Sequence, residues 1–202
     1  MKKLFFLLSM AFAGMQSANA QTSEIFGSFS AVTYKTNMGF NSPIKESYNL
    51  SGLSLGYNSL RPFIDDRFYL VVGGKLSYIW NKEDRSTENI FRIKVPASIK
   101  LKLYNHAKGD ANAVEPYAGL NASAFMAHYI TANEKYSNSS YTTDMKASND
   151  LNNFTFGCHV GVDFCISNFV IGVCYEQDLT NYSQDFSSKW SSVDFKVGFR
   201  FE

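Results

Sequence analysis

Apolar and polar residues alternate most regularly between residues 154 and 178. Every second residue from Phe154 to Ile166 is apolar, and the alternation resumes after a two-residue break at Ser167-Asn168. Strict alternation on both sides of such a break predicts a β-hairpin. In the register that this loop sets, the apolar residues of both strands share one face.

The two strands of this hairpin are about 12 residues long, against about 5–6 in a typical soluble sheet. A strand of about 9–11 residues with one apolar and one polar face is what a tilted transmembrane β-strand requires. The hairpin alone therefore fits two classes of protein. One is an outer-membrane β-barrel with its apolar face toward lipid, and the other is a soluble barrel or sandwich with that face turned inward.

The same alternation recurs along the chain and predicts eight strands without an internal repeat. They span residues 26–35, 50–59, 67–80, 92–103, 115–131, 154–166, 169–178 and 191–202. The first strand alternates too weakly for its faces to be assigned. Pro96 lies within the fourth strand and predicts a bulge or local bend, because proline cannot donate a ladder hydrogen bond. On the fifth strand, Ile130 is placed on the apolar face with Leu120 and Met126.

The connections between these strands alternate in length. Those after the second, fourth and sixth strands have only about 7, 10 and 2 residues. The other four are long and polar, and they span residues 36–49, 81–91, 132–153 and 179–190. Short periplasmic turns alternating with longer outer loops are typical of outer-membrane barrels.

Side-chain size favours the same class of protein. Bulky residues such as Phe156 and Phe199 fall on the apolar faces, whereas Gly157, Gly161 and Gly172 fall on the polar faces. The interior of an eight-stranded barrel is only just wide enough for side chains. We therefore expect the apolar faces to point outward and the polar faces to line the interior.

The N-terminus predicts export. Lys2-Lys3, an apolar run and Ala18-Asn19-Ala20 form the basic, apolar and cleavage regions of a signal peptide. We expect a signal peptide at residues 1–20 and one barrel domain at residues 21–202. The full chain has 19 Lys+Arg and 18 Asp+Glu, and removal of two lysines leaves a net charge of −1. Such a balance predicts no nucleic-acid partner.

The polar faces carry the candidate chemistry. His159 is expected opposite Glu176, with Asp163 nearby, either as an acid–base or proton-relay pair or as an ordinary interior hydrogen bond. A basic row on the fourth strand could attract anions or pair with interior carboxylates, since buried charges need partners. The predicted interior charge network consists of His159, Glu176, Asp163, Arg92, Lys94, Lys100, Lys102, Asp194, Lys196 and Arg200. No phosphate-binding loop, metal cluster or placed nucleophile accompanies it, so we expect no cofactor.

Three cysteines are too few for a disulfide framework in an exported protein. The alternation places Cys158 on the outer face and Cys165 and Cys174 on the inner face. Cys174 is expected opposite Gly161, beyond bridging distance from Cys165. We predict free thiols that act as small apolar fillers.

Three segments resemble the PorT-like family of outer-membrane β-barrel proteins, found in bacteria with the type IX secretion system. They are Ile93-Lys94-Val95-Pro96 with the following Ile99-Lys100-Leu101-Lys102, the segment Glu115-Pro116-Tyr117-Ala118-Gly119, and the glycine-rich hairpin with the aromatic terminal strand. The chain departs from the family in its first strand and in ending at Glu202. The resemblance implies location in the bacterial outer membrane and a barrel architecture, but no specific activity.

We therefore expect an all-β protein: an eight-stranded antiparallel up-and-down transmembrane β-barrel after a cleaved signal peptide. The expected role is a non-enzymatic one in the envelope, either structural, in surface interaction or as a secretion accessory. Outer-membrane lipid is the expected partner, together with surface or envelope proteins that contact the four long loops. A narrow passive, porin-like channel and a soluble periplasmic lipid-binding barrel remain the alternatives.

Overall fold

The computed structural model describes the strands of the chain and most of their connections. The described residues are 22–38, 44–64, 67–83, 86–104, 112–133, 140–144, 152–183 and 187–201. The predicted signal peptide, residues 1–20, lies outside them. Within the described residues, no helix is long and apolar enough to cross a membrane.

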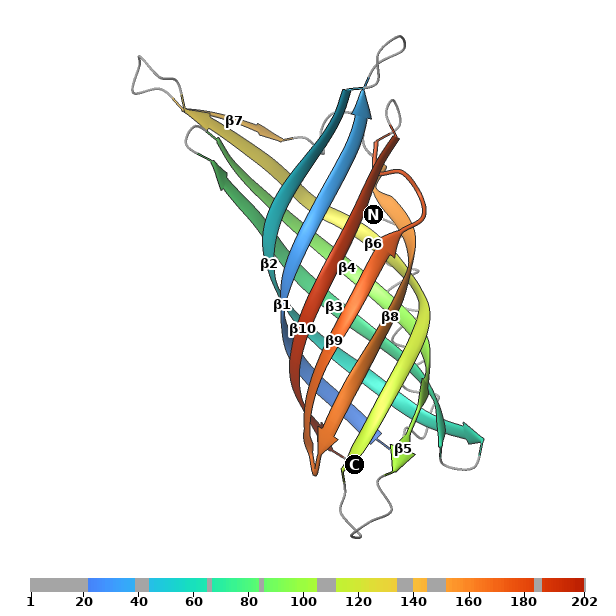
Figure 1. Cartoon of the computed structure of the whole chain (residues 1–202). Coiled ribbons are helices and arrows are strands. Elements are labelled where there is room, and N and C mark those ends of the chain that lie inside the picture. The colour runs from blue at the N-terminus through green and yellow to red at the C-terminus, as the bar shows by residue number, and fades with distance from the viewer. Residues whose placement is uncertain are drawn as a thin grey trace.

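Eight long strands form a closed antiparallel barrel, as the sequence predicts (Figure 1). They are β1 (Thr22–Met38), β2 (Ile44–Ile64), β3 (Phe68–Glu83), β4 (Ser86–Leu101), β6 (Ala113–Asn133), β8 (Phe154–Ile166), β9 (Phe169–Asp178) and β10 (Ser187–Phe201), and two short strands, β5 (Leu103–Tyr104) and β7 (Ser140–Asp144), accompany them. Pairing of β1 with β10 and of β4 with β6 closes the wall. The two-residue β5 continues β4 along β6, and β7 pairs with β6 beyond the wall.

The predicted hairpin is β8–β9, and its register is as expected. His159 pairs with Glu176 and Gly161 pairs with Cys174. Ser167, the first residue of the two-residue turn, has a φ of 54°. Two-residue hairpin turns require a positive φ at this position because it matches the twist of the flanking strands.

The barrel is inverted relative to a soluble protein, and this confirms the predicted orientation of its faces. Phe156 is 59% exposed and Leu120 is 65% exposed, whereas Lys100 is 2% exposed and Asp163 is fully buried. Apolar side chains therefore cover the outside of the wall, and charged side chains fill the inside.

One predicted face is wrong because β6 contains a bulge. On β4, Phe91 pairs with Ala127 but the next residue pairs with Phe125, so Met126 is an extra residue. The alternation of inward and outward side chains is reversed after this extra residue. Ile130 therefore falls on the inward side, although the sequence pattern places it outside. Of the bulge or local bend expected at Pro96, the bulge is absent, because β3 and β4 keep one register on both sides of this residue.

The strands are longer than predicted, so the four expected loops are partly β-ladder. The predicted loop 36–49 begins within β1 and ends within β2, which are paired as far as Met38 and Ile44. Likewise β3 and β4 are paired as far as Glu83 and Ser86. Beyond the apolar part of the wall, two strands can stay paired through their backbone hydrogen bonds without any alternation of apolar side chains. The sequence pattern therefore underestimates the length of these strands.

The two ends of the barrel differ. We call the end with the connections β1–β2, β3–β4, β6–β8 and β9–β10 the loop end. Several strands extend there beyond the closed part of the barrel (Figure 1). The opposite end, with the connections β2–β3, β5–β6 and β8–β9, is the turn end, and the C-terminus lies there (Figure 1).

Candidate functional site

The inward faces of the strands bring together a network of buried charges. Within the described part of the chain, six cationic and six anionic side chains form it, so their formal charges cancel. The cations are Lys75, Arg92, Lys94, Lys100, Lys196 and Arg200, and the anions are Glu24, Glu115, Asp163, Glu176, Asp178 and Asp194. Buried charges are costly unless they are paired. The pairing hypothesis for the basic row of β4 therefore fits better than an anion-attracting lumen.

The layer of charges nearest the turn end, which we call the lower layer, is centred on Asp163. Its Oδ2 accepts hydrogen bonds of 2.6 Å from the Nζ atoms of both Lys100 and Lys196. Beside it, the Arg200 guanidinium donates two hydrogen bonds of 2.8 Å to the Glu115 carboxylate. This fork-to-fork geometry is the strongest form of an ion pair. Glu24 completes the layer, with contacts of 2.9 Å to Lys196 and 3.0 Å to Arg200.

The middle layer is centred on Glu176. Its carboxylate accepts a hydrogen bond of 3.0 Å from Lys75 and a second one from Lys94. Lys75 also donates to Asp194 on β10. The third layer lies nearer the loop end, and in it Arg92 donates to Asp178 across the barrel. The charges thus tie opposite walls of the barrel together through its centre.

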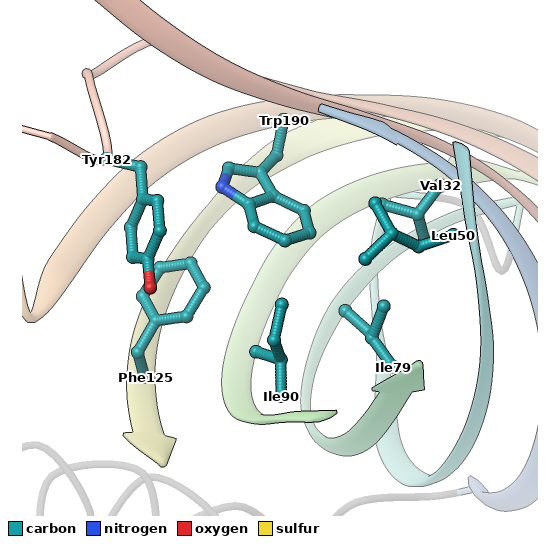
Figure 2. Close-up of a cluster of buried hydrophobic side chains, with 7 residues drawn as sticks. All are labelled: Val32, Leu50, Ile79, Ile90, Phe125, Tyr182 and Trp190. Carbon is teal, nitrogen blue, oxygen red and sulfur yellow. The ribbon is translucent and has the colours of Figure 1, made fainter. Parts of the chain in front are cut away.

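An apolar cap closes the interior at the loop end (Figure 2). Its members are Val32, Leu50, Ile79, Ile90, Phe125, Tyr182 and Trp190. Six of them come from six different strands. Tyr182 comes from the β9–β10 connection and packs its ring 4.2 Å from that of Phe125. Because β8 and β9 supply no member of this cluster, Tyr182 from the connection completes the apolar layer.

Tyr182 is held in the cap by both its backbone and its hydroxyl. Its backbone N–H donates to Ser188 O at 2.9 Å, and its C=O accepts from Asn152 N at 2.7 Å. The hydroxyl lies 2.6 Å from His128 Nδ1, and His128 Nε2 lies 2.6 Å from Glu88 Oε1. Burial raises the pKa of the Tyr182 hydroxyl above its ordinary value, so this hydroxyl keeps the proton that it can donate to the imidazole.

The predicted pair of His159 and Glu176 is adjacent but not hydrogen-bonded as expected. The two residues lie opposite each other, yet the Glu176 carboxylate binds the two lysines of the middle layer. His159 Nδ1 is buried without a hydrogen-bond partner within the described part of the chain. The geometry therefore does not form the acid–base dyad that the sequence suggested.

The nine predicted network residues other than His159 divide into two groups. Eight of them are among the twelve charges described above: Glu176, Asp163, Arg92, Lys94, Lys100, Asp194, Lys196 and Arg200. Lys102 instead lies at the turn end, half-buried, with its ammonium 5.9 Å over the ring of Tyr69. It is outside the three layers because β4 ends at Leu101, two residues before β5 begins.

Sequence reasoning missed two central carboxylates, Glu24 and Glu115. A signal existed for Glu115, which lies two residues before the inward-facing Tyr117. Glu24 precedes the predicted first strand, whose alternation was unreadable because Phe26 points inward while Gly27 points outward.

Two small cavities remain within the charged interior. One of about 60 Å³ is lined by residues of the lower and middle layers, and one of about 20 Å³ lies toward the cap. Several buried polar atoms that have no partner among the described residues belong to residues that line them: Ser28 Oγ, His159 Nδ1, Asp163 Oδ1, Asp194 Oδ1, Arg92 Nε and Trp190 Nε1. Volumes of this size suit a few water molecules bound to such atoms. They do not suit an organic substrate.

The remaining candidate chemistry of the interior is sparse. Within the described residues, no group of three or more His, Cys, Asp and Glu side chains could hold a metal ion. The three cysteines are free, as predicted, with Cys165 and Cys174 buried and Cys158 half-buried on the outer face. The described interior is thus a neutral, ion-paired column under an apolar cap.

Comparison with known proteins identifies the fold. No protein-family model matches the sequence, and no curated protein matches it. Among solved structures, the chain is similar to Ail, the attachment invasion locus protein of Yersinia pestis, with 14% identity, a TM-score of 0.50, and coverage of 89% of this chain and 98% of Ail. A structure of Ail in complex with the heparin analogue sucrose octasulfate gives 15% identity, a TM-score of 0.51 and the same coverage.

Neisserial surface protein A also matches, with 14% identity, a TM-score of 0.49, and coverage of 89% of this chain and 97% of that protein. Identities this low concern the fold alone. The fold is that of an eight-stranded outer-membrane β-barrel.

Proposed function

We propose that this protein resides in the bacterial outer membrane and has a non-enzymatic role in the envelope, either structural, in surface interaction or as an accessory to secretion. The observation that carries the proposal is the inversion of the barrel, with apolar side chains outside and a charge-balanced network inside. In water this arrangement would expose a large apolar surface and bury twelve charges. In a bilayer the same surface is solvated by lipid.

The height of the apolar band supports the membrane location. On β3 the outward-facing residues run from Phe68 to Trp80, which is about 40 Å of strand at about 3.3 Å per residue. At the tilt of about 40° that is usual for such barrels, the band is about 30 Å high. This height matches the hydrocarbon core of a bilayer, which is about 30 Å thick.

Aromatic residues gather at both edges of this band. At the loop end, the ring centroids of Tyr78 and Phe91 are 4.9 Å apart, and Trp80 stacks on the same tyrosine. At the turn end, the rings of Phe169 and Phe199 are 5.6 Å apart. Aromatic girdles at two membrane interfaces are typical of outer-membrane barrels.

The proposal includes the N-terminal processing and the family. Residues 1–20 would be removed on export as a signal peptide, and residues 21–202 would form the mature domain. Membership in the PorT-like family remains part of this proposal, and its support is the resemblance of the β4, β6 and terminal-strand segments. That resemblance, together with the loop-end strand extensions, favours display of the connections at 36–49, 81–91, 132–153 and 179–190 to surface or envelope proteins.

The filled interior favours a structural role over a channel or a lipid carrier. The cap and the three charged layers occupy the lumen along its length, so a passive channel would have to displace them. Below the apolar cap, most side chains on the interior faces of the described strands are charged or polar, which is unsuited to enclosing a lipid chain. An enzymatic role would need a reactive group that the interior network does not supply.

The membrane location can be tested directly in cells. The full chain, expressed with its own N-terminus in a Gram-negative host, should fractionate with the outer membrane, require detergent for extraction and migrate faster on a gel before heating than after. Release into a periplasmic extract without detergent would contradict the proposal. Purified protein in a planar bilayer should give no openings above background, and regular single-channel steps would favour the channel instead.

A further inference from the structure

We propose that Lys35 and Lys189 form a binding site for the phosphate of an anionic membrane lipid in the leaflet at the loop end. The site rests on the proposed membrane location and adds a specific lipid contact to it. It lies on the outer surface of the wall, where β1 and β10 pair. Its support is the placement, above an apolar wall, of two like charges that have no ion-pair partner among the described residues.

The two lysines face each other across the β1–β10 ladder. Lys35 pairs directly with Lys189, and both are exposed. Directly opposed residues have Cβ atoms about 5 Å apart, and like charges in this arrangement repel each other. Neither ammonium has an ion-pair partner within the described residues, in contrast to the six cations inside the barrel. A bound anion between the two would remove this repulsion.

The surrounding surface offers hydrogen-bond donors and no described negative charge. In the row below the lysines, Thr33 Oγ1 donates to Asn49 Oδ1 at 3.3 Å. Because the Asn49 oxygen accepts this bond, its amide nitrogen remains available to donate. Ser47 lies beside Lys35 on β2 and is exposed. None of the described outward-facing residues of β9, β10, β1 and β2 at this level is acidic.

The wall below the lysines is suited to acyl chains. Two rows below Lys35, the outward-facing residues become apolar, beginning with Ala31 and Val193 and continuing with Phe29 and Phe195. Ala31 is four residue steps along the strand from Lys35, which is about 10 Å along the barrel axis at the usual tilt. A lipid whose chains lie on this wall therefore places its phosphate at the level of the two ammonium groups. A soluble anion would gain nothing from the wall.

The test compares lipid binding by matched charge variants. The folded, full barrel in neutral maltoside micelles is titrated with phosphatidylglycerol and, separately, with phosphatidylcholine of the same chain length, and bound lipids are counted by native mass spectrometry. The site variant is K35Q/K189Q. The control is R61Q/R67Q, which removes two exposed charges at the turn end. The gel-mobility shift on heating establishes that each variant is folded.

We expect the wild type to prefer phosphatidylglycerol and K35Q/K189Q to lose at least tenfold in affinity for it, since each lysine near an anionic lipid contributes about fivefold. Phosphatidylcholine binding should be unchanged, and the control should stay within about twofold of the wild type. Equal losses in both variants would mean general charge attraction and would overturn the site. So would full displacement of the lipid by its soluble headgroup, glycerophosphoglycerol, because the wall would then contribute nothing.

Failure of this site and failure of the proposed location are distinguishable. A chain that inserts into bilayers but shows no headgroup preference overturns the lipid site alone. A chain that does not insert overturns both.

Discussion

Removal of one interior charge tests whether the buried network acts as a unit. Asp163 is fully buried and its Oδ2 accepts from both Lys100 and Lys196 at 2.6 Å. Asp163→Asn keeps the shape but leaves three cations facing two carboxylates in the lower layer. Breaking a buried ion pair in this way costs about 3–5 kcal/mol. Lys196→Met removes the opposite charge and should cost a similar amount.

The double variant D163N/K196M should be much less unstable than the two single variants together predict. It restores the charge balance of the layer, so the free energy of unfolding should recover by at least about 2 kcal/mol relative to the sum. The measurement is urea unfolding of the barrel in lipid vesicles, followed by tryptophan fluorescence. The control cycle is K35M with R61M, two exposed residues on opposite ends of the barrel, which should be additive within about 0.5 kcal/mol.

Additivity of D163N and K196M within that same margin would refute the interior network. It would mean that each side chain is solvated independently, as in a water-filled lumen. A destabilisation below about 1 kcal/mol for either single variant would lead to the same conclusion, because that is the range of exposed ion pairs.

Three further predictions concern the cap, a close contact and the thiols. Tyr182→Phe should cost about 1 kcal/mol through its lost hydrogen bond, and Tyr182→Ala about 3–5 kcal/mol through the cavity left in the cap; equal losses in urea unfolding would contradict the apolar packing. Gly172→Ala should destabilise the barrel by about 1–3 kcal/mol, because its Cβ would clash with Oδ1 of the buried Asp163, whereas Gly74→Ala, with no atom within 4 Å, should be nearly neutral. Cys165 and Cys174 should resist maleimide until the barrel is unfolded, and rapid labelling of the folded protein would show that they are accessible.

The faces of most strands could be predicted because alternation reports the side chain's environment directly. In β8 and β9 the outward positions are apolar except Gln177, and the inward ones are small, polar or charged except Val170, so the register followed from the sequence. In β1 the signal fails, since Phe26 and Val32 point inward and Gly27 and Ala31 outward. A Cβ at Gly56 would clash with the Phe26 ring, so this inward aromatic depends on a small residue of the neighbouring strand that no local pattern reveals.

The bulge and the cap could not be predicted, because both depend on tertiary contacts. Met126 lies among apolar residues, and nothing in the sequence marks it as the extra residue between β4 and β6. Tyr182 lies in a polar segment that reads as a solvent-exposed loop. Its burial depends on Phe125 and Trp190, which come from strands far apart in the chain. The interior charges were largely predicted, but their partners were not, because pairing across a barrel depends on strand tilt and stagger.

The central claim is that the apolar face of the wall contacts lipid. The most direct measurement places a single spin label in turn at Leu55, Phe156 and Val197, three outward positions around the barrel, in a cysteine-free variant reconstituted into vesicles. The paramagnetic relaxation of each label is then compared for oxygen, which concentrates in the bilayer, and for a water-soluble nickel complex. A lipid-facing wall gives strong relaxation by oxygen and little by nickel at all three positions. Weak relaxation by both reagents, or stronger relaxation by nickel, would contradict a membrane-spanning barrel.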